Sequence, residues 1–257
     1  MSTTRVFQAD RFNAGARDYA DRWAPVLLPH ARRLLARIPL ASARRVLDIA
    51  TGVGSLLPEI RAAAPDAHVV GIDIARAMLS LAPSGFDLAV MDAAVLALAD
   101  ASFDAAVMPF AVFFLPRPDA ALREARRVLR PGAPFGVTSW YGEPTFPALD
   151  AWLGEIRALG APHPRWAAET LEPAALRAEL ERAGFTDVRT TLERFDHPHD
   201  PATFLHLRLA LMKPWLDSVA ADARAELVAR VRARLAALAS DDFIDRTEII
   251  EATARAL

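Results

Sequence analysis

The chain has 257 residues, of which 53% are hydrophobic and 24% charged, with 30 basic side chains against 32 acidic ones. This balance excludes a polybasic protein that binds nucleic acid mainly through phosphates, and the apolar content excludes a largely disordered chain. Without cysteine, disulfides, thiolate metal ligands and a cysteine nucleophile are excluded. The most apolar stretch, residues 105–115, is too short to span a membrane. We expect a cytoplasmic protein without a membrane span.

Between residues 44 and 140, short apolar runs alternate with segments of helical period. The runs predict strands at 44–50, 67–73, 86–92, 102–110 and 132–140. A helix at 119–129 places its apolar residues on one face and its arginines on the other. This alternation is typical of a parallel sheet covered by helices on both faces.

After residue 140 the pattern becomes mostly helical. A helix is expected at 147–159, and another ends at Gly184 before a sixth strand. The segment 201–239 is helical with an interruption at Pro214, and residues 246–257 supply a last strand. A long helical insertion at this place predicts a lid or cap rather than a simple connection.

The most informative segment is VLDIATGVGS, residues 46–55. Its strand contains Asp48, and the following loop places Gly52 and Gly54 ahead of a helix, where free backbone N–H groups bind ligands. The second strand ends at Asp73, where a carboxylate accepts hydrogen bonds from ribose hydroxyls. Together these features predict a cofactor that contains a nucleoside.

Three cofactor classes compete for this loop. A nucleotide P-loop requires Gly-Lys-Ser/Thr, which the segment lacks. A dinucleotide site requires a third glycine where the chain has Leu57, and Asp48 would repel the pyrophosphate. A carboxylate before the loop favours a cofactor with a positively charged amino group.

Several segments in order carry a resemblance to a known family: VLDIATGVG, VVGIDIARAML and the stretch from VMDAAVLALAD to GVTSW. They resemble the core of class I S-adenosylmethionine-dependent methyltransferases, above all the small-molecule branch of the ubiquinone and menaquinone biosynthetic enzymes (methyltransferase type 11). The resemblance covers residues 44–140 and, to a lesser degree, 170–195. The family usually has glycine where this chain has Ala50.

This resemblance implies an α/β fold, a doubly wound, seven-stranded and mostly parallel Rossmann-like sheet with a helical cap. We expect a single methyltransferase domain over residues 1–257. Its core would comprise residues 41–140, 170–196 and 243–257, and its cap residues 1–40, 141–169 and 200–240. The implied function is methyl transfer from S-adenosylmethionine to a small-molecule acceptor, with no nucleic acid as partner; a homodimer is compatible with the sequence.

The resemblance also implies roles for individual residues. Asp48 would hold the methionine amino group and Asp73 both ribose hydroxyls. The backbone of Ala50, Thr51, Gly52 and Gly54 would line the methionine and ribose, and the adenine would contact Ile74, Met78, Asp92 and Ala93. Phe110 would lie beside the transferring methyl group, and Tyr19 would cover the cofactor. For Met78, Phe110 and Tyr19, ordinary packing is an alternative explanation.

No motif identifies a general base. Tyr141 is the best-placed candidate because it follows the fifth strand at the ligand-binding edge of the sheet. The other candidates are His163, His197, His199 and His206. The DHPHD segment, residues 196–200, favours a solvated turn over a metal site, since prolines interrupt it and further ligands are lacking.

Apolar residues gather in the segments expected to cover the site, and they favour an apolar or aromatic acceptor, although many of them would also serve as core between cap and sheet. These residues are Trp140, Phe146, Trp152, Trp166, Phe204, Leu205, Met212 and Trp215. Two other functions stay open. One is an S-adenosylmethionine-binding protein with a non-methylating or regulatory role, and the other, less favoured, is an NAD(P)-dependent oxidoreductase.

Overall fold

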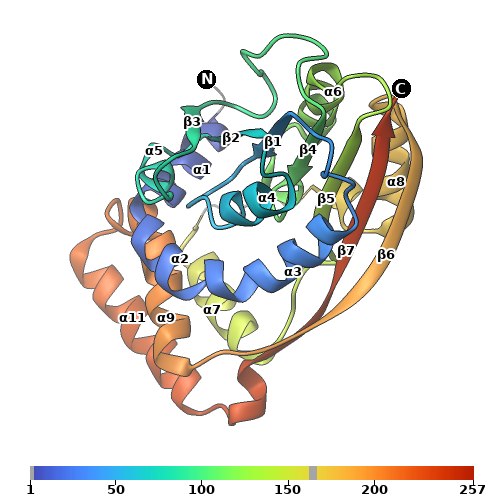
Figure 1. Cartoon of the computed structure of the whole chain (residues 1–257). Helices are drawn as coiled ribbons and strands as arrows, with labels where there is room; N and C mark the ends of the chain where they lie inside the picture. Colours follow the sequence, from blue (N-terminus) through green and yellow to red (C-terminus); the bar gives the residue numbers. More distant parts are fainter. Residues whose placement is uncertain (1–2, 162–166) are drawn as a thin grey trace.

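A seven-stranded sheet forms the centre of the computed structural model, which describes residues 3–161 and 167–257. The strands are β1 (Arg45–Ile49), β2 (His68–Asp73), β3 (Asp87–Val90), β4 (Ala105–Met108), β5 (Pro134–Tyr141), β6 (Phe185–Pro198) and β7 (Ile244–Ala256). Their order is β3-β2-β1-β4-β5-β7-β6, and only β7 runs antiparallel to its neighbours (Figure 1). The predicted doubly wound, mostly parallel sheet is confirmed.

The order of the strands determines where a ligand can bind. From β1 the chain proceeds to β2 and β3 on one side, and then crosses to β4 and β5 on the other. The loops after β1 and β4 therefore leave in opposite directions and open a crevice at the carboxyl ends of these strands. The glycine loop follows β1, so this crevice is where the predicted cofactor residues meet.

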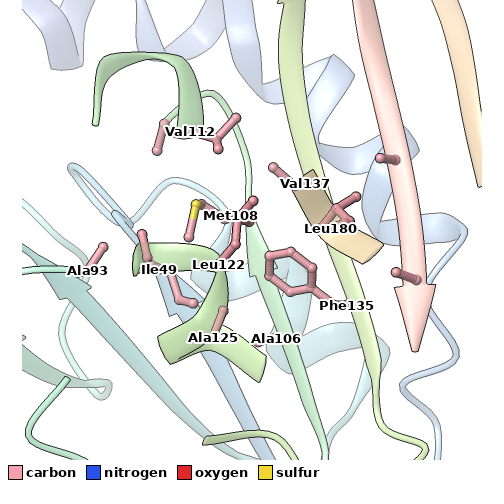
Figure 2. Close-up of a cluster of buried hydrophobic side chains, with 14 of the residues drawn as sticks. Ile49, Ala93, Ala106, Met108, Val112, Leu122, Ala125, Phe135, Val137 and Leu180 are labelled. Atoms are coloured by element: carbon pink, nitrogen blue, oxygen red, sulfur yellow. The ribbon is translucent and has the colours of Figure 1, made fainter. Parts of the chain in front are cut away.

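Helices cover both faces of the sheet. Their bounds are α1 (Thr3–Ala14), α2 (Ala16–Arg22), α3 (Ala24–Ala36), α4 (Leu57–Ala63), α5 (Arg76–Leu79), α6 (Pro118–Val128), α7 (Pro147–Ala158), α8 (Pro173–Arg182), α9 (Pro201–Leu211), α10 (Lys213–Leu216) and α11 (Ala221–Ala236). On one face, Leu122 and Leu180 of α6 and α8 pack against Ile49, Phe135 and Val137 of the strands (Figure 2). On the other face, α3 and α4 pack against β1, β2 and β4. The amphipathic helix expected at 119–129 corresponds to α6.

The helix α3 lies on the sheet, although residues 1–40 were expected to belong to the cap. A Cβ added to Gly136 of β5 would come within 2.8 Å of Ile38 Cδ1 and 3.2 Å of Leu34 Cδ1. The missing side chain thus lets the end of α3 approach the strand closely, and Leu34 is fully buried there. Local sequence does not reveal this contact, because the apolar face of α3 suits a cap as well as a sheet.

The cap contains an apolar cluster of its own. Side chains of α7, α9, α10 and α11 form it, with Trp152, Phe204 and Leu227 fully or almost fully buried. The cluster lies at the end of the long antiparallel pair β6 and β7, which carries α9 to α11 between its strands (Figure 1). The helical segment is interrupted near Pro214, as expected, but not at Pro214 itself, which lies in the first turn of α10. The interruptions are at Met212, between α9 and α10, and between Leu216 and Ala221.

No helix within the described ranges is both long and apolar enough to cross a lipid bilayer.

Candidate functional site

A cavity of about 370 Å³ opens at the carboxyl ends of the central strands. Apart from Gly54, every predicted cofactor residue lines it: Tyr19, Asp48, Ala50, Thr51, Gly52, Asp73, Ile74, Met78, Asp92, Ala93 and Phe110. They come from α2, from the ends of β1 and β2, from α5, and from the loops that follow β1, β2, β3 and β4. Folding therefore brings the separate sequence segments to one place.

Gly54 is the exception, because it packs behind the loop instead of lining the cavity. Its φ is +70°, and a Cβ there would lie 2.8 Å from Ala82 Cβ and 2.9 Å from Leu57 Cδ1. The glycine is needed for a left-handed turn and for a close approach to the segment after α5. Among the predicted cofactor residues, Gly54 is thus the one that the structure does not place on the cavity surface.

Asp48 lies at the centre of the sheet, where its strand is paired on both sides, and it is 1% exposed. One carboxylate oxygen accepts a hydrogen bond from Thr51 Oγ1 at 2.6 Å. The other oxygen is buried and has no hydrogen-bond partner among the described residues. Burial raises the pKa of Asp48 to about 7, against the lowering effect of the Thr51 hydrogen bond. A buried, half-satisfied carboxylate fits an ammonium group of a ligand.

Asp73 joins the glycine loop to the end of β2. Its Oδ2 accepts a hydrogen bond from the Gly52 N–H at 2.9 Å, and its Oδ1 accepts one from the Ala75 N–H at 2.8 Å. Burial raises the pKa of this carboxyl, and the backbone hydrogen bonds oppose the shift. Each carboxylate oxygen has a second lone pair, so Asp73 keeps the capacity to accept hydrogen bonds from ribose hydroxyls.

The loop between these acids has the backbone conformation of a ligand cradle. Ala50 has a φ of +58° and Gly52 a φ of +59°, both in the left-handed region. This conformation explains why the family prefers glycine where this chain has Ala50. A Cβ on Gly52 would point toward Tyr19 and Met78, which lie 4.0 Å away, so the missing side chain leaves room against the loop.

The N-terminal helices form a wall of the cavity. Phe12 contacts Tyr19 edge to face, with ring centroids 6.1 Å apart. Asn13 Oδ1 accepts a hydrogen bond from the Ala77 N–H at 2.9 Å, which connects α1 to α5. Burial, followed by the charge of Asp73, raises the pKa of Tyr19 above its ordinary value. Tyr19 is therefore a neutral phenol over the loop.

On the opposite side, Asp92 and Ala93 follow β3. Asp92 Oδ1 accepts a hydrogen bond from the Ala94 N–H at 2.9 Å, which closes a tight turn, and Ala93 is buried. Phe110 follows β4 with a φ of +55°, and its N–H donates to Thr138 Oγ1 at 2.8 Å. This hydrogen bond holds a strained residue at the boundary of the cavity.

A second cavity, of about 150 Å³, adjoins the first. Both are lined by Phe12, Tyr19, Leu27, Phe110 and Phe114. Beyond this shared wall, the second cavity is formed by residues of α1, α7, α9 and the ends of β5 and β7, and it is mainly apolar. A molecule in the second cavity would therefore lie beside one in the first.

The predicted aromatic cover divides between this cavity and the cap. Trp140, Trp152 and Met212 line the second cavity. Phe146, Phe204, Leu205 and Trp215 belong to the apolar cluster of the cap. Packing thus explains more of this set than ligand binding does, while Trp166 and His163 lie outside the described residues.

Tyr141 does not reach either cavity, and its proposed part in catalysis is not supported by its position. It is 39% exposed, whereas Trp140, the preceding residue, is 4% exposed and lines the second cavity. Neighbouring side chains of a strand point to opposite faces. Tyr141 is the last residue of β5, at the expected edge of the sheet, but its side chain lines neither cavity.

The other base candidates that the structure describes also lie away from the cofactor cavity. His199 stacks between Trp23 and Phe146, at centroid distances of 5.5 and 5.3 Å, and burial lowers its pKa to about 3. His206 is exposed and contacts Asp18. Residues 196–200 end a long strand and begin α9, so DHPHD is not the solvated turn that was expected.

Four charged residues of the second cavity were missed by the sequence analysis: Arg11, Glu143, Arg208 and Asp245. Arg208 is preceded by PATFLHL and followed by LAL, so a lone arginine in an apolar helix was a signal that could have been used. Arg11 and Asp245 have no such signal, because polar residues surround them in the sequence.

Comparisons with known proteins agree with this site. A family model described as a methyltransferase domain matches residues 47–136. A malonyl-[acyl-carrier protein] O-methyltransferase of Brevibacillus brevis is 30% identical over 175 residues, 63% of this chain and 62% of that relative, so the chain spans less than two thirds of its length. A ubiquinone/menaquinone biosynthesis C-methyltransferase of Syntrophotalea carbinolica is 32% identical over 174 residues, 59% of this chain and 73% of that relative.

The fold has many solved counterparts. The structure of phosphoethanolamine N-methyltransferase 2 of Haemonchus contortus, in complex with S-adenosyl-L-methionine, aligns with 99% of this chain and 60% of that chain, with a TM-score of 0.64 at 18% identity. The glycine loop, the two buried acids and these similarities all indicate a methyltransferase domain that uses S-adenosylmethionine. The chain therefore belongs to the class I S-adenosylmethionine-dependent methyltransferases of the small-molecule type, a family whose cofactor is S-adenosylmethionine.

Proposed function

We propose that this protein transfers a methyl group from S-adenosylmethionine to a small, largely apolar or aromatic acceptor. The observation that carries the proposal is the common wall of the two cavities. The first contains the half-satisfied carboxylate of Asp48, and the second is lined mainly by aromatic and aliphatic side chains. A cofactor and an acceptor bound in them would meet at Phe110, Phe114 and Tyr19.

The bound cofactor supplies an electrophilic methyl group on a sulfonium. The residues of the chain then have to hold the acceptor in line with it and exclude water. Asp48 is placed to bind the amino group of the cofactor, and Asp73 to bind its ribose. Phe12 and Phe110 line both cavities, so their rings would help to keep solvent away from the reacting atoms.

Tyr19 is suited to donate a hydrogen bond rather than to remove a proton. Its raised pKa keeps the phenol protonated at neutral pH. Positioning of a nucleophile is therefore the main contribution that these residues make to the rate. An acceptor whose nucleophilic atom needs no deprotonation fits this site best.

Two measurements test the proposal. Calorimetry should detect binding of S-adenosylhomocysteine and no comparable binding of NADH. Incubation with S-adenosylmethionine labelled on its methyl group, together with a fractionated bacterial extract, should transfer label to the apolar small-molecule fraction. The matched Asp73→Ala variant should lose the transfer, because it lacks the ribose acceptor. Preferential NADH binding, or label found only in macromolecules, would contradict the proposal.

A further inference from the structure

Two arginines line the inner part of the second cavity. Arg11 belongs to α1 and Arg208 to α9, and both face the cavity whose other walls are largely aromatic. Arg11 is 9% exposed. Their Coulomb interaction is repulsive and is large enough to lower the pKa of Arg11 further, after burial as the main cause. The fold has therefore brought two guanidinium groups of like charge together.

Both guanidinium groups have unused hydrogen-bond donors. Nε and Nη1 of Arg11 and Nε of Arg208 are buried and have no hydrogen-bond partner among the described residues. Arg11 lies over the rings of Phe12 and Phe114 at 5.7 and 5.6 Å, and Arg208 lies 5.0 Å from the ring of Phe204. Ring faces stabilise the positive charge but accept none of the in-plane N–H groups.

The acids nearby do not balance this charge within the part of the chain that the structure describes. Asp245 is a buried acid that lines the same cavity, and it attracts Arg208, but one of its oxygens already accepts a hydrogen bond from Thr247. Glu143, at the rim, is exposed. His199 also interacts with Arg208, but burial lowers its pKa to about 3, so its ring is neutral at neutral pH and adds no charge. Even with Asp245 ionised, two guanidinium groups against one buried carboxylate leave an excess of positive charge, and buried charges require a partner.

We propose, resting on the function proposed above, that the acceptor is an aromatic or aliphatic carboxylic acid whose carboxylate binds between Arg11 and Arg208. The charge balance requires a monoanion, and guanidinium donors match a carboxylate in geometry. The apolar body of the acid lies against Trp140, Trp152 and Phe114, in the direction of the wall that the cavities share. The carboxylate is an anchor that aims the rest of the molecule at the cofactor.

The test uses two probes of nearly equal shape, phenylacetate and the neutral phenylacetamide. Both are titrated into the protein saturated with S-adenosylhomocysteine, and binding is followed by tryptophan fluorescence, because Trp23, Trp140 and Trp152 line the cavity. We expect the wild-type protein to bind phenylacetate at least about tenfold more tightly than phenylacetamide, the smallest difference that a charge-assisted hydrogen bond predicts.

The variants Arg11→Met and Arg208→Met should each reduce this preference, and the double variant should abolish it. Arg208→Lys should keep part of it, because the charge remains while the planar donors are lost. Arg224→Met in α11 removes the same charge from a residue of the cap that lines neither of the two cavities, and it should leave the preference unchanged. Thermal unfolding and S-adenosylhomocysteine binding, measured on every variant, show that the fold and the cofactor cavity are intact.

Equal affinity of the wild-type protein for the two probes, or no binding of phenylacetate, overturns the carboxylate site while leaving methyl transfer untouched. A preference that persists in the double variant also overturns it. Failure of S-adenosylhomocysteine to bind is a different result: it contradicts the proposed function, and the preference for phenylacetate, measured without it, still reports on the arginine pair.

Discussion

Asp48 lies where a negative charge is least stable unless a cation is present. Its burial at the centre of the sheet raises its pKa to about 7, and one of its oxygens has no hydrogen-bond partner within the described ranges. In water an ordinary aspartate is ionised at neutral pH, but here the two forms are of similar stability. An ammonium group of the cofactor would favour the ionised form and so couples proton release to binding.

The affinity for S-adenosylhomocysteine should therefore depend on pH. Below the folded pKa of Asp48, about 7, a proton must leave before the ammonium binds, so affinity should rise toward pH 7, by up to about tenfold per pH unit. Asp48→Asn should bind more weakly at pH 8, by about 1–3 kcal/mol, and lose this pH dependence. Calorimetry from about pH 5.5 to 8 measures both effects.

The free energy of unfolding of the ligand-free protein should fall as pH rises, whereas the affinity for S-adenosylhomocysteine should rise. The folded pKa of Asp48 exceeds its ordinary value of 3.8, so its contribution is fully present below that value and is lost as pH rises through about 7. Asp48→Asn should remove this loss, whereas Asp119→Asn on the exposed surface of α6 should not. If neither the affinity for S-adenosylhomocysteine nor the stability of the wild-type protein changed with pH in this way, Asp48 would not titrate near pH 7, and the prediction would be wrong.

The two glycines of the glycine loop serve different purposes, one in the cofactor cavity and one in packing. Gly52 and Gly54 both have positive φ, yet only Gly52 lines the cofactor cavity. Gly54 instead allows the loop to approach Ala82 and Leu57. The loop is therefore a thin wall, with a ligand surface on one side and a packed surface on the other.

Substitution of Gly54 by alanine should destabilise the protein strongly. The new Cβ would overlap Ala82 Cβ at 2.8 Å and would also have to adopt a φ of +70°. Gly132 is the matched control, because its φ is +78° and a Cβ there would meet no atom of the described residues within 4 Å. We expect Gly132→Ala to cost about 1 kcal/mol and Gly54→Ala about 2–4 kcal/mol, from strain plus overpacking. Urea unfolding measures the difference, and equal costs would contradict the packing role.

At the scale of the whole molecule, two apolar cores meet at the cavities. One lies on the sheet and the other in the cap of α7 and α9 to α11, and the N-terminal helices α1 and α2 lie between them. The wall that these helices form is connected to α5 by the hydrogen bond from Ala77 to Asn13. Ligand binding should therefore stabilise α1, α2 and α5 together.

Hydrogen exchange tests this coupling. Addition of S-adenosylhomocysteine should slow amide exchange in α2, in α5 and in the part of α1 near Phe12, because these segments line or support the cavity. Exchange in α8, which packs on the sheet away from the cavity, should stay the same and serves as the internal control. Slower exchange spread evenly over all helices would contradict the prediction that α1, α2 and α5 are stabilised together as a local unit.

Much of the fold and of the cofactor site could be predicted because their signals are local. The strand and helix periods lie within short segments, and the predicted sheet is confirmed. The spacing from Asp48 to Asp73 is also local, and both acids line the cavity. The positions of Gly54 and Tyr141 relative to the cavities could not be predicted, for one physical reason. The side of a loop or strand that a residue faces depends on which other elements pack against it. The local sequence does not show which elements pack against the loop of Gly54 or the strand of Tyr141.

The sequence by itself thus determined the parallel sheet, the edge at which a ligand binds and the chemistry of the cofactor, since periodicity and loop composition act over a few residues. Only the tertiary structure placed α3 on the sheet, joined the two cavities and brought Arg11 and Arg208 together from opposite ends of the chain. The near balance of charge over 257 residues concealed this local excess of positive charge. Burial and long-range contacts decide where a charge remains without a partner.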